Sequence, residues 1–345
     1  MTISGTVEAL CDVVINVSWQ ATILGLVVLA IRYIFGRIIR PEMMVALWII
    51  VLVRLLLSGG PESPFSLSNF TGVHVMPVSQ PSDAPSEGLN LEIDFFIIRL
   101  ISMIWITGVL MKLARWVRLQ AFWKEMFRSC ELVGDPDILN ALADAENDLG
   151  QDPQVELVHS RFVQSPALYG LFRPRLIIPT GMMDQLTSHQ WYLIFRHEVA
   201  HMKRGDMLTM HLIRVFQAIH WFNPLLRLIF RQIEMDMELA ADGVALRNCR
   251  PGEKKTYART LLRFFELPPM DPGQIQPIRV GFWNEEREIF SRFHAIAGRP
   301  KSYHISIAFI LTTVTLLAII GLTDPMFPRP IQPLSFDTIR LLIDW

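Results

Sequence analysis

A short segment in the middle of the chain combines two histidines and a glutamate at a spacing suited to metal chemistry. It is His197-Glu198-Val199-Ala200-His201. On a helix, residues four apart lie on the same face, so both imidazoles can bind one metal ion. Glu198 would then be placed to accept a proton from a metal-bound water. The same pattern also arises by chance in core helices whose histidines are merely packed, so a zinc site needs a further ligand.

Candidate ligands lie downstream, because catalytic zinc usually has three protein ligands and one open position. Glu234, Glu238 and Asp242 recur every four residues and therefore share a helical face. The apolar residues among them are Met237, Leu239, Ala240 and Ala241. They indicate partial burial, where carboxylates without a partner are costly and a metal would compensate. We assign Glu238 as the third ligand and Asp242 as the carboxylate that accepts a hydrogen bond from a ligand histidine. Glu234 is the alternative ligand, and a solvated acidic face is the alternative structure.

Further segments accompany this motif in a characteristic order. They are Ser165–Pro179, Lys203–Asp206, Ile219–Pro224 and Glu238–Asp242. Together with the histidine motif they resemble the BlaR/MecR family of integral-membrane metallopeptidases, over roughly residues 10 to 322. The resemblance implies that His197, His201 and Glu238 bind one zinc ion per chain. It also implies that Glu198 is the catalytic base and Asp242 the supporting acid.

The composition independently predicts a membrane protein. Hydrophobic residues make up 51% and charged residues 19%, and the mean hydropathy is +0.32, whereas a soluble domain is about a quarter charged. The formal net charge of −1 gives no indication of direct nucleic-acid binding. Cys11, Cys130 and Cys249 are far apart, so they predict neither a metal site nor a disulfide framework, which suits a reducing cytosol.

Four apolar segments approach the roughly 20 residues needed to cross a bilayer. They cover residues 13–31, 43–57, 95–113 and 304–322. No basic residue precedes Arg32 and no clear cleavage motif follows the first segment, so we interpret it as a retained span rather than a signal peptide. The lipid bilayer is therefore an expected partner.

Basic residues predict the orientation of these spans. Arg32, Arg37 and Arg40 lie between the first two, residues 59–94 contain no Lys or Arg, and several basic residues follow the third. We expect a multi-pass protein of the bacterial inner (cytoplasmic) membrane, with the N-terminus, the loop 59–94 and a short tail of residues 323–345 outside. The N-terminal membrane region is 1–113, and residues 114–303 form the cytoplasmic domain.

Within residues 114–303, helices are predicted at 138–149, 206–219 and 224–246, the last with Asn223 as its N-cap and Pro224 in its first turn. A strand is predicted at 155–159 and a hairpin at 169–179, punctuated by Gly170 and Pro174. With the resemblance, this predicts a multi-pass α-helical membrane protein with a cytoplasmic α+β zinc metallopeptidase domain of gluzincin type. An edge strand beside the zinc helix could hold an extended peptide. Residues 207–230 are apolar but include His211, Arg214 and Arg227, so we interpret them as a buried helix pair near the membrane surface.

The favoured function is a regulatory, membrane-embedded zinc endopeptidase. By resemblance, it cleaves a cytoplasmic protein such as a BlaI/MecI-type repressor in response to an outside signal, and cleavage of itself within residues 266–300 is open. We expect the tail of residues 323–345 not to form the family's extracellular penicillin-binding sensor domain. The signal is then expected to come from a partner, the membrane or the loop 59–94. A membrane-protein quality-control protease and a non-proteolytic signalling scaffold are the alternatives. Homodimerisation stays open, and so does the oxyanion-stabilising group, for which the candidates are His211, His220, Arg247 and Tyr257.

Overall fold

The protein is described here by a computed structural model. It covers residues 3–36, 38–57, 62–63, 88–151, 155–163, 165–171, 174–266, 291–296 and 307–325. Most of the predicted outer loop 59–94, of the segment 266–300 and of the tail 323–345 lies outside the described residues. Helices dominate the described ranges and strands form small sheets, so the chain is a helical, mixed α+β protein.

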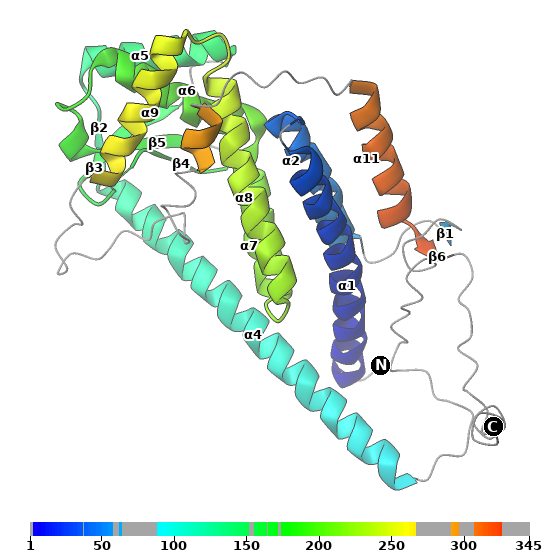
Figure 1. Ribbon diagram of the computed structural model, residues 1–345. Coiled ribbons are helices and arrows are strands. Elements are labelled where there is room, and N and C mark those ends of the chain that lie inside the picture. The colour runs from blue at the N-terminus through cyan, green and yellow to red at the C-terminus, as the bar shows by residue number, and fades with distance from the viewer. Residues whose placement is uncertain are drawn as a thin grey trace.

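A helix occupies each of the four segments predicted to span a membrane (Figure 1). They are α1 (Ile3–Phe35), α2 (Pro41–Leu56), α4 (Gly88–Arg128) and α11 (Ile307–Gly321). Two stretches among the described residues are long and apolar enough to cross a membrane, Leu10–Phe35 in α1 and Phe96–Arg128 in α4. α2 and α11 are apolar but shorter, with 16 and 15 residues, and both pack against α1.

α4 extends well beyond the predicted end of the third span at residue 113. It continues to Arg128, because no glycine or proline interrupts it after Gly108. Its last turns bury Trp123, Met126 and Phe127 against the sheet that follows. One continuous helix therefore connects a candidate membrane span to the sheet.

The main sheet has four strands. They are β2 (Glu131–Leu132), β3 (Glu156–Ser160), β4 (Ala167–Tyr169) and β5 (Arg175–Pro179), in the spatial order β2-β3-β5-β4. β3 and β5 are parallel and the other two pairings are antiparallel. The predicted strand near residues 155–159 and the predicted hairpin are thereby confirmed. A separate two-residue pairing joins β1 (Glu62–Ser63) to β6 (Asp324–Pro325).

Neighbouring residues of the central strand β5 face two different cores, because successive strand side chains point to opposite faces. Leu176 and Ile178 pack with α5 (Pro136–Leu149) and α6 (Ser188–Arg204). Ile177 packs with the end of α4. Burial on both faces explains why this strand is apolar without alternation. The sheet thus forms the layer on which α6 rests.

The chain continues into a helical hairpin made of α7 (Asp206–Ile219) and α8 (Pro224–Ala245), followed by α9 (Pro251–Glu266). The Asn223 side chain accepts hydrogen bonds from the backbone N–H groups of Leu225 and Leu226, and Pro224 occupies the first turn. This N-cap is the one the sequence predicts. The hairpin lies between α4 and α1 in Figure 1.

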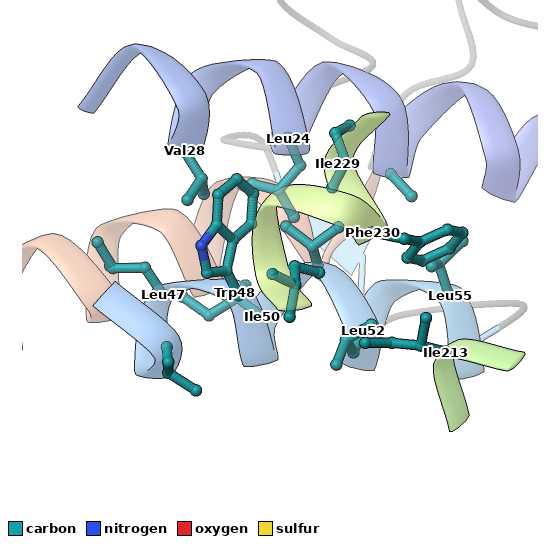
Figure 2. Packing of buried hydrophobic residues seen from close by; sticks show 14 of the residues in the cluster. Leu24, Val28, Leu47, Trp48, Ile50, Leu52, Leu55, Ile213, Ile229 and Phe230 are labelled. Carbon is teal, nitrogen blue, oxygen red and sulfur yellow. The ribbon is translucent and has the colours of Figure 1, made fainter. Parts of the chain in front are cut away.

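The hairpin shares a core with the helices of the N-terminal region. Figure 2 shows Trp48 of α2 in a cluster with Leu24 of α1 and with Ile229 and Phe230 of α8. Ile213 of α7 belongs to the same cluster, and the Trp48 side chain is fully buried. The segments on either side of the predicted boundary at residues 113 and 114 therefore pack against each other.

Candidate metal centre

Two helices bring the three predicted ligands together. α6 carries His197 and His201 one turn apart, and α8 carries Glu238. The ring Nε2 atoms of the two histidines lie 3.1 Å apart. Glu238 Oε2 is 3.3 Å from His197 Nε2, and its Oε1 is 3.5 Å from His201 Nε2. One ligand atom from each of the three residues lies within 4.8 Å of the others.

Local sequence explains why α6 presents its histidines here. The helix begins with a capping box, in which the Thr187 side chain accepts from the Gln190 backbone and Gln190 accepts from the Thr187 backbone. It ends at Gly205, whose φ of 70° is in the left-handed region that glycine adopts most readily. Gly205 turns the chain immediately into α7, one turn after His201.

The Nδ1 atom of each histidine lies within hydrogen-bond distance of a buried carboxylate. His197 Nδ1 lies 3.0 Å from Asp242 Oδ1, and His201 Nδ1 lies 2.8 Å from Asp206 Oδ2. An ionised carboxylate only accepts, so Nδ1 of each ring donates, and a neutral ring then keeps a lone pair on Nε2. Two such lone pairs facing each other repel unless a cation lies between them. The donor set of two imidazoles and a carboxylate, with its outer carboxylates, is the set that catalytic zinc uses.

Asp206 is a site residue that sequence reasoning missed. It follows the Gly205 turn as the first residue of α7, is 4% exposed, and is also bound by Arg204 Nε at 3.0 Å. A sequence signal was present, since an acidic residue directly after a glycine helix end can return toward the last turn of the preceding helix. Asp242, in contrast, was singled out from the sequence, and it lies beside His197.

Glu198 follows His197 on α6 and is partly exposed. Burial raises the pKa of its carboxyl, and the neighbouring His197 and His201 act in the opposite direction. A carboxylate beside the ligand histidines whose pKa is raised in this way is suited to hold and release a proton.

A second missed residue is Arg292, in the short helical segment 291–296. Its Nε donates to Asp242 Oδ2 at 2.8 Å and its Nη2 to Asp242 Oδ1 at 2.7 Å. Its Nη1 lies 3.2 Å from Glu238 Oε2. The guanidinium therefore bridges a predicted ligand and a predicted supporting acid. No pattern around Arg292 distinguishes it in the sequence from other basic residues of the same segment.

The oxyanion candidates are widely separated in the structure. Tyr257 of α9 is fully buried at the site, where its hydroxyl donates to Asp242 Oδ1 at 2.6 Å. Burial and the Asp242 charge raise the pKa of Tyr257. Arg247 binds Glu42 Oε1 at 3.1 Å, and His211 Nδ1 binds the Met207 carbonyl oxygen at 2.7 Å. We use the term ligand cluster for His197, His201 and Glu238 together with the adjoining Asp242. Of the four candidates, only Tyr257 contacts this cluster through the described hydrogen bonds and ion pairs.

Two further predicted residues lie away from the ligand cluster. Glu234, the alternative ligand, pairs with Arg214 of α7 at 3.1 Å between Oε1 and Nη1. His220 is buried at the turn between α7 and α8. Among the described residues, the cluster with metal-ligand geometry contains Glu238 and not Glu234.

Comparison with known proteins gives consistent matches. The methicillin resistance mecR1 protein of Staphylococcus aureus is 21% identical over 340 residues, which cover 90% of this chain and 56% of that protein. Regulatory protein BlaR1 of Bacillus licheniformis is 23% identical over 218 residues, covering 61% of this chain and 35% of that protein. Regulatory protein BlaR1 of Staphylococcus aureus is 31% identical over 100 residues, or 29% of this chain and 17% of that protein.

The chain thus spans little more than half the length of the mecR1 protein and about a third of the Bacillus licheniformis BlaR1 protein. The model of the family described as BlaR1 peptidase M56 matches residues 12–296, which include most of α1, the sheet, the histidine motif and the segment of Arg292. The match covers well over half of the sequence. The chain belongs to the BlaR1 peptidase M56 family, a family of metallopeptidases.

Proposed function

We propose that this protein is a zinc-dependent endopeptidase of the bacterial cytoplasmic membrane. It cleaves a cytoplasmic protein when a signal arrives from outside. The observation that carries the proposal is the convergence of His197 Nε2, His201 Nε2 and a Glu238 carboxylate oxygen. Each imidazole is also oriented by its own buried carboxylate. A packed core helix requires neither feature.

In the proposed mechanism, His197, His201 and Glu238 would hold the zinc ion. When bound, zinc supplies a Lewis acid and makes a water nucleophilic near neutral pH. Glu198 accepts the proton of the attacking water and passes it to the leaving amine nitrogen.

Asp206 and Asp242 keep the two ligand imidazoles in the tautomer with Nε2 free. Tyr257 holds Asp242 in place, so it acts on the ligand set through that carboxylate, whereas Arg292 contacts both Asp242 and Glu238.

The sheet offers a place for the substrate. β4 (Ala167–Tyr169) is an edge strand of the four-stranded sheet, and it contacts α6. An extended peptide can add to such an edge through main-chain hydrogen bonds. This supports cleavage of a protein segment bound in extended conformation beside α6.

The packing of α1 against α8 supports the proposed orientation. Arg32, near the end of α1, binds Asp236, two residues before Glu238. Arg32, in the last turn of α1, therefore lies near the level of the ligand cluster. Basic loops are retained in the cytoplasm, which supports a cytoplasmic metal site, with α1, α2, α4 and α11 as the membrane helices.

For the substrate, we propose a transcriptional repressor of the BlaI/MecI type, because the relatives named above carry the names regulatory protein and methicillin resistance protein. Self-cleavage is a second target of the same site. It is supported by the position of the segment 291–296, whose Arg292 contacts Glu238 and Asp242.

The test uses the full chain purified in detergent as wild type, Glu198→Ala, His201→Ala and Glu238→Ala. We expect about one zinc ion per chain in the wild type and in Glu198→Ala, and loss of zinc from the other two variants. Cleavage of a co-expressed repressor, detected through the appearance of its fragments, should occur only with the wild type. Zinc-free but folded wild type, or cleavage by Glu198→Ala, would overturn the proposal. Fragments of membrane proteins without cleavage of the repressor would indicate a quality-control protease.

A further inference from the structure

The turn between α7 and α8 is joined to the middle of a candidate membrane span. Asn223 Nδ2 donates to Ser18 Oγ and to Thr22 Oγ1, each at 2.8 Å. Ser18 and Thr22 lie near the midpoint of α1 and inside the apolar stretch Leu10–Phe35. The hairpin turn is therefore level with the centre of that stretch.

The same turn is joined to the second candidate span, on α4. Trp105 Nε1 donates to the Ile219 carbonyl oxygen at 3.0 Å, and Trp221 Nε1 donates to the Trp105 carbonyl oxygen at 3.2 Å. Gly108 makes the approach close, because a Cβ at this position would overlap the Trp221 indole. Trp105 and Gly108 both lie in the apolar stretch Phe96–Arg128. Residues inside the apolar stretches of both α1 and α4 thus contact the turn.

The depth can be estimated from helix geometry. Ser18 precedes Arg32 by fourteen residues, which is about 20 Å along a helix. Arg32 binds Asp236 near the ligand cluster, whereas Ser18 binds the hairpin turn. The hydrocarbon core of a bilayer is about 30 Å thick. A hairpin that begins at the level of Arg32 and ends at Ser18 would reach beyond its centre.

The outer surface of the hairpin is mostly apolar, and Arg227 is its exposed charged residue near the turn. Its large side chains with substantial exposure are Leu208, Trp221, Phe222, Leu225 and Leu228. The turn also satisfies its backbone groups internally. The Asn223 side chain accepts from two backbone N–H groups of α8, and the Asn223 N–H donates to the His220 carbonyl oxygen at 3.0 Å. A chain turn can exist at membrane depth only when neighbouring protein groups satisfy it in this way.

We propose that the α7–α8 hairpin is a re-entrant element that enters the hydrocarbon layer from the cytoplasmic side and returns, with its exposed apolar residues in contact with lipid acyl chains. The inference rests on the membrane topology of the proposed function. It changes the interpretation of residues 207–230, since the pair reaches membrane depth instead of lying near the surface. α7 begins at Asp206 and α8 carries Glu238. The lipid-embedded hairpin therefore holds the metal site close to the membrane surface.

The test measures depth with single spin labels in proteoliposomes. In a full-length background in which Cys11, Cys130 and Cys249 are replaced by serine, one cysteine is introduced as Leu225→Cys, Leu26→Cys or Leu139→Cys. The three leucines are matched in exposure, at 40%, 43% and 40%. Leu225 is in the hairpin, Leu26 is in α1 and Leu139 is in α5 beside the sheet. Collision of each label with oxygen and with a water-soluble nickel chelate is then compared.

We expect the ratio of oxygen to nickel collisions at Leu225→Cys to be several-fold higher than at Leu139→Cys and close to that at Leu26→Cys. A ratio at Leu225→Cys that equals the ratio at Leu139→Cys, with Leu26→Cys in lipid, would overturn the re-entrant hairpin alone. Water-accessible labels at both Leu26→Cys and Leu225→Cys would overturn the membrane topology and the hairpin together. Zinc content of each variant reports whether the fold is intact and separates failure of the hairpin from failure of the protease.

Discussion

Arg32 of α1 and Asp236 of α8 are 204 residues apart in the sequence and form an ion pair. The distance between Arg32 Nε and Asp236 Oδ1 is 2.9 Å. Asp236 is 3% exposed and also accepts a hydrogen bond from Trp48 Nε1 at 2.8 Å. One carboxylate on α8 therefore binds both α1 and α2. Because Asp236 lies about half a turn before Glu238, a shift of α1 or α2 would be transmitted to the ligand cluster.

Removing this carboxylate should destabilise the protein. For Asp236→Asn we expect a loss of about 2 kcal/mol in the free energy of unfolding, less than for a fully buried pair because 30% of the Arg32 side chain is exposed. Thermal unfolding in detergent of Asp236→Asn, Arg32→Gln and the double variant gives the coupling energy. If the effects of the two single variants add in full, the ion pair contributes nothing and the prediction is wrong.

Asp206 should matter for metal binding more than for folding. Its replacement in Asp206→Ala leaves His201 Nδ1 without its 2.8 Å partner, so the ring loses its fixed tautomer. Loss of such an outer carboxylate typically weakens metal affinity by about 10–100-fold. Competition with a zinc chelator measures the change. Asp184→Ala is the matched control, because Asp184 is exposed, and equal affinities for the two variants would contradict the assignment.

The two candidate glutamates of α8 should respond differently to substitution. Glu238→Gln weakens one of the three converging ligands, and we expect it to lower the zinc content. Glu234→Gln removes only the ion pair with Arg214 at 3.1 Å, so it should keep its zinc and lose stability at most. Metal analysis of both purified variants decides the matter. Zinc loss in Glu234→Gln alone would transfer the ligand role to that residue.

Arg292 should oppose metal binding. Its guanidinium lies 3.2 Å from Glu238 Oε2 and 2.7 Å from Asp242 Oδ1. The positive charge of Arg292 would therefore compete with a bound zinc ion for these two carboxylates. We expect Arg292→Ala to bind zinc several-fold more tightly than the wild type, and Arg292→Lys to be intermediate, because the charge stays but the fork geometry is lost. Arg259→Ala, at an exposed position of α9, should show wild-type affinity. Weaker zinc binding by Arg292→Ala would refute this competition.

Close packing at Gly108 should be required for the hairpin to contact α4. A side chain at this position would overlap the Trp221 indole, so Gly108→Val should destabilise the protein by about 1–3 kcal/mol through overpacking. Trp221→Ala removes the obstructing ring. The double variant should therefore be less destabilised than the sum of the two single variants, as followed by thermal unfolding in detergent. Strict additivity would show that the two residues do not meet.

Local patterns predicted the elements well. Helix periodicity placed His197 and His201 on one face, and the Asn223-Pro224 pair marked the start of α8, because caps and periodicity depend on residues a few positions apart. The observed bounds of α7 agree with the prediction. The predicted third span ends at residue 113, where the apolar composition ends, and that prediction made no statement about the helix itself, which continues to Arg128.

The amino-acid sequence by itself determined the helices, the strands and the face of each helix that carries chemistry, since these follow from backbone propensity and short-range spacing. Only the tertiary structure decided that Asp206 returns to His201, that Arg292 enters the ligand cluster, and that α7 and α8 pack between the candidate membrane spans. Such contacts join residues up to 204 positions apart. Their geometry depends on how whole helices pack, which no local pattern encodes.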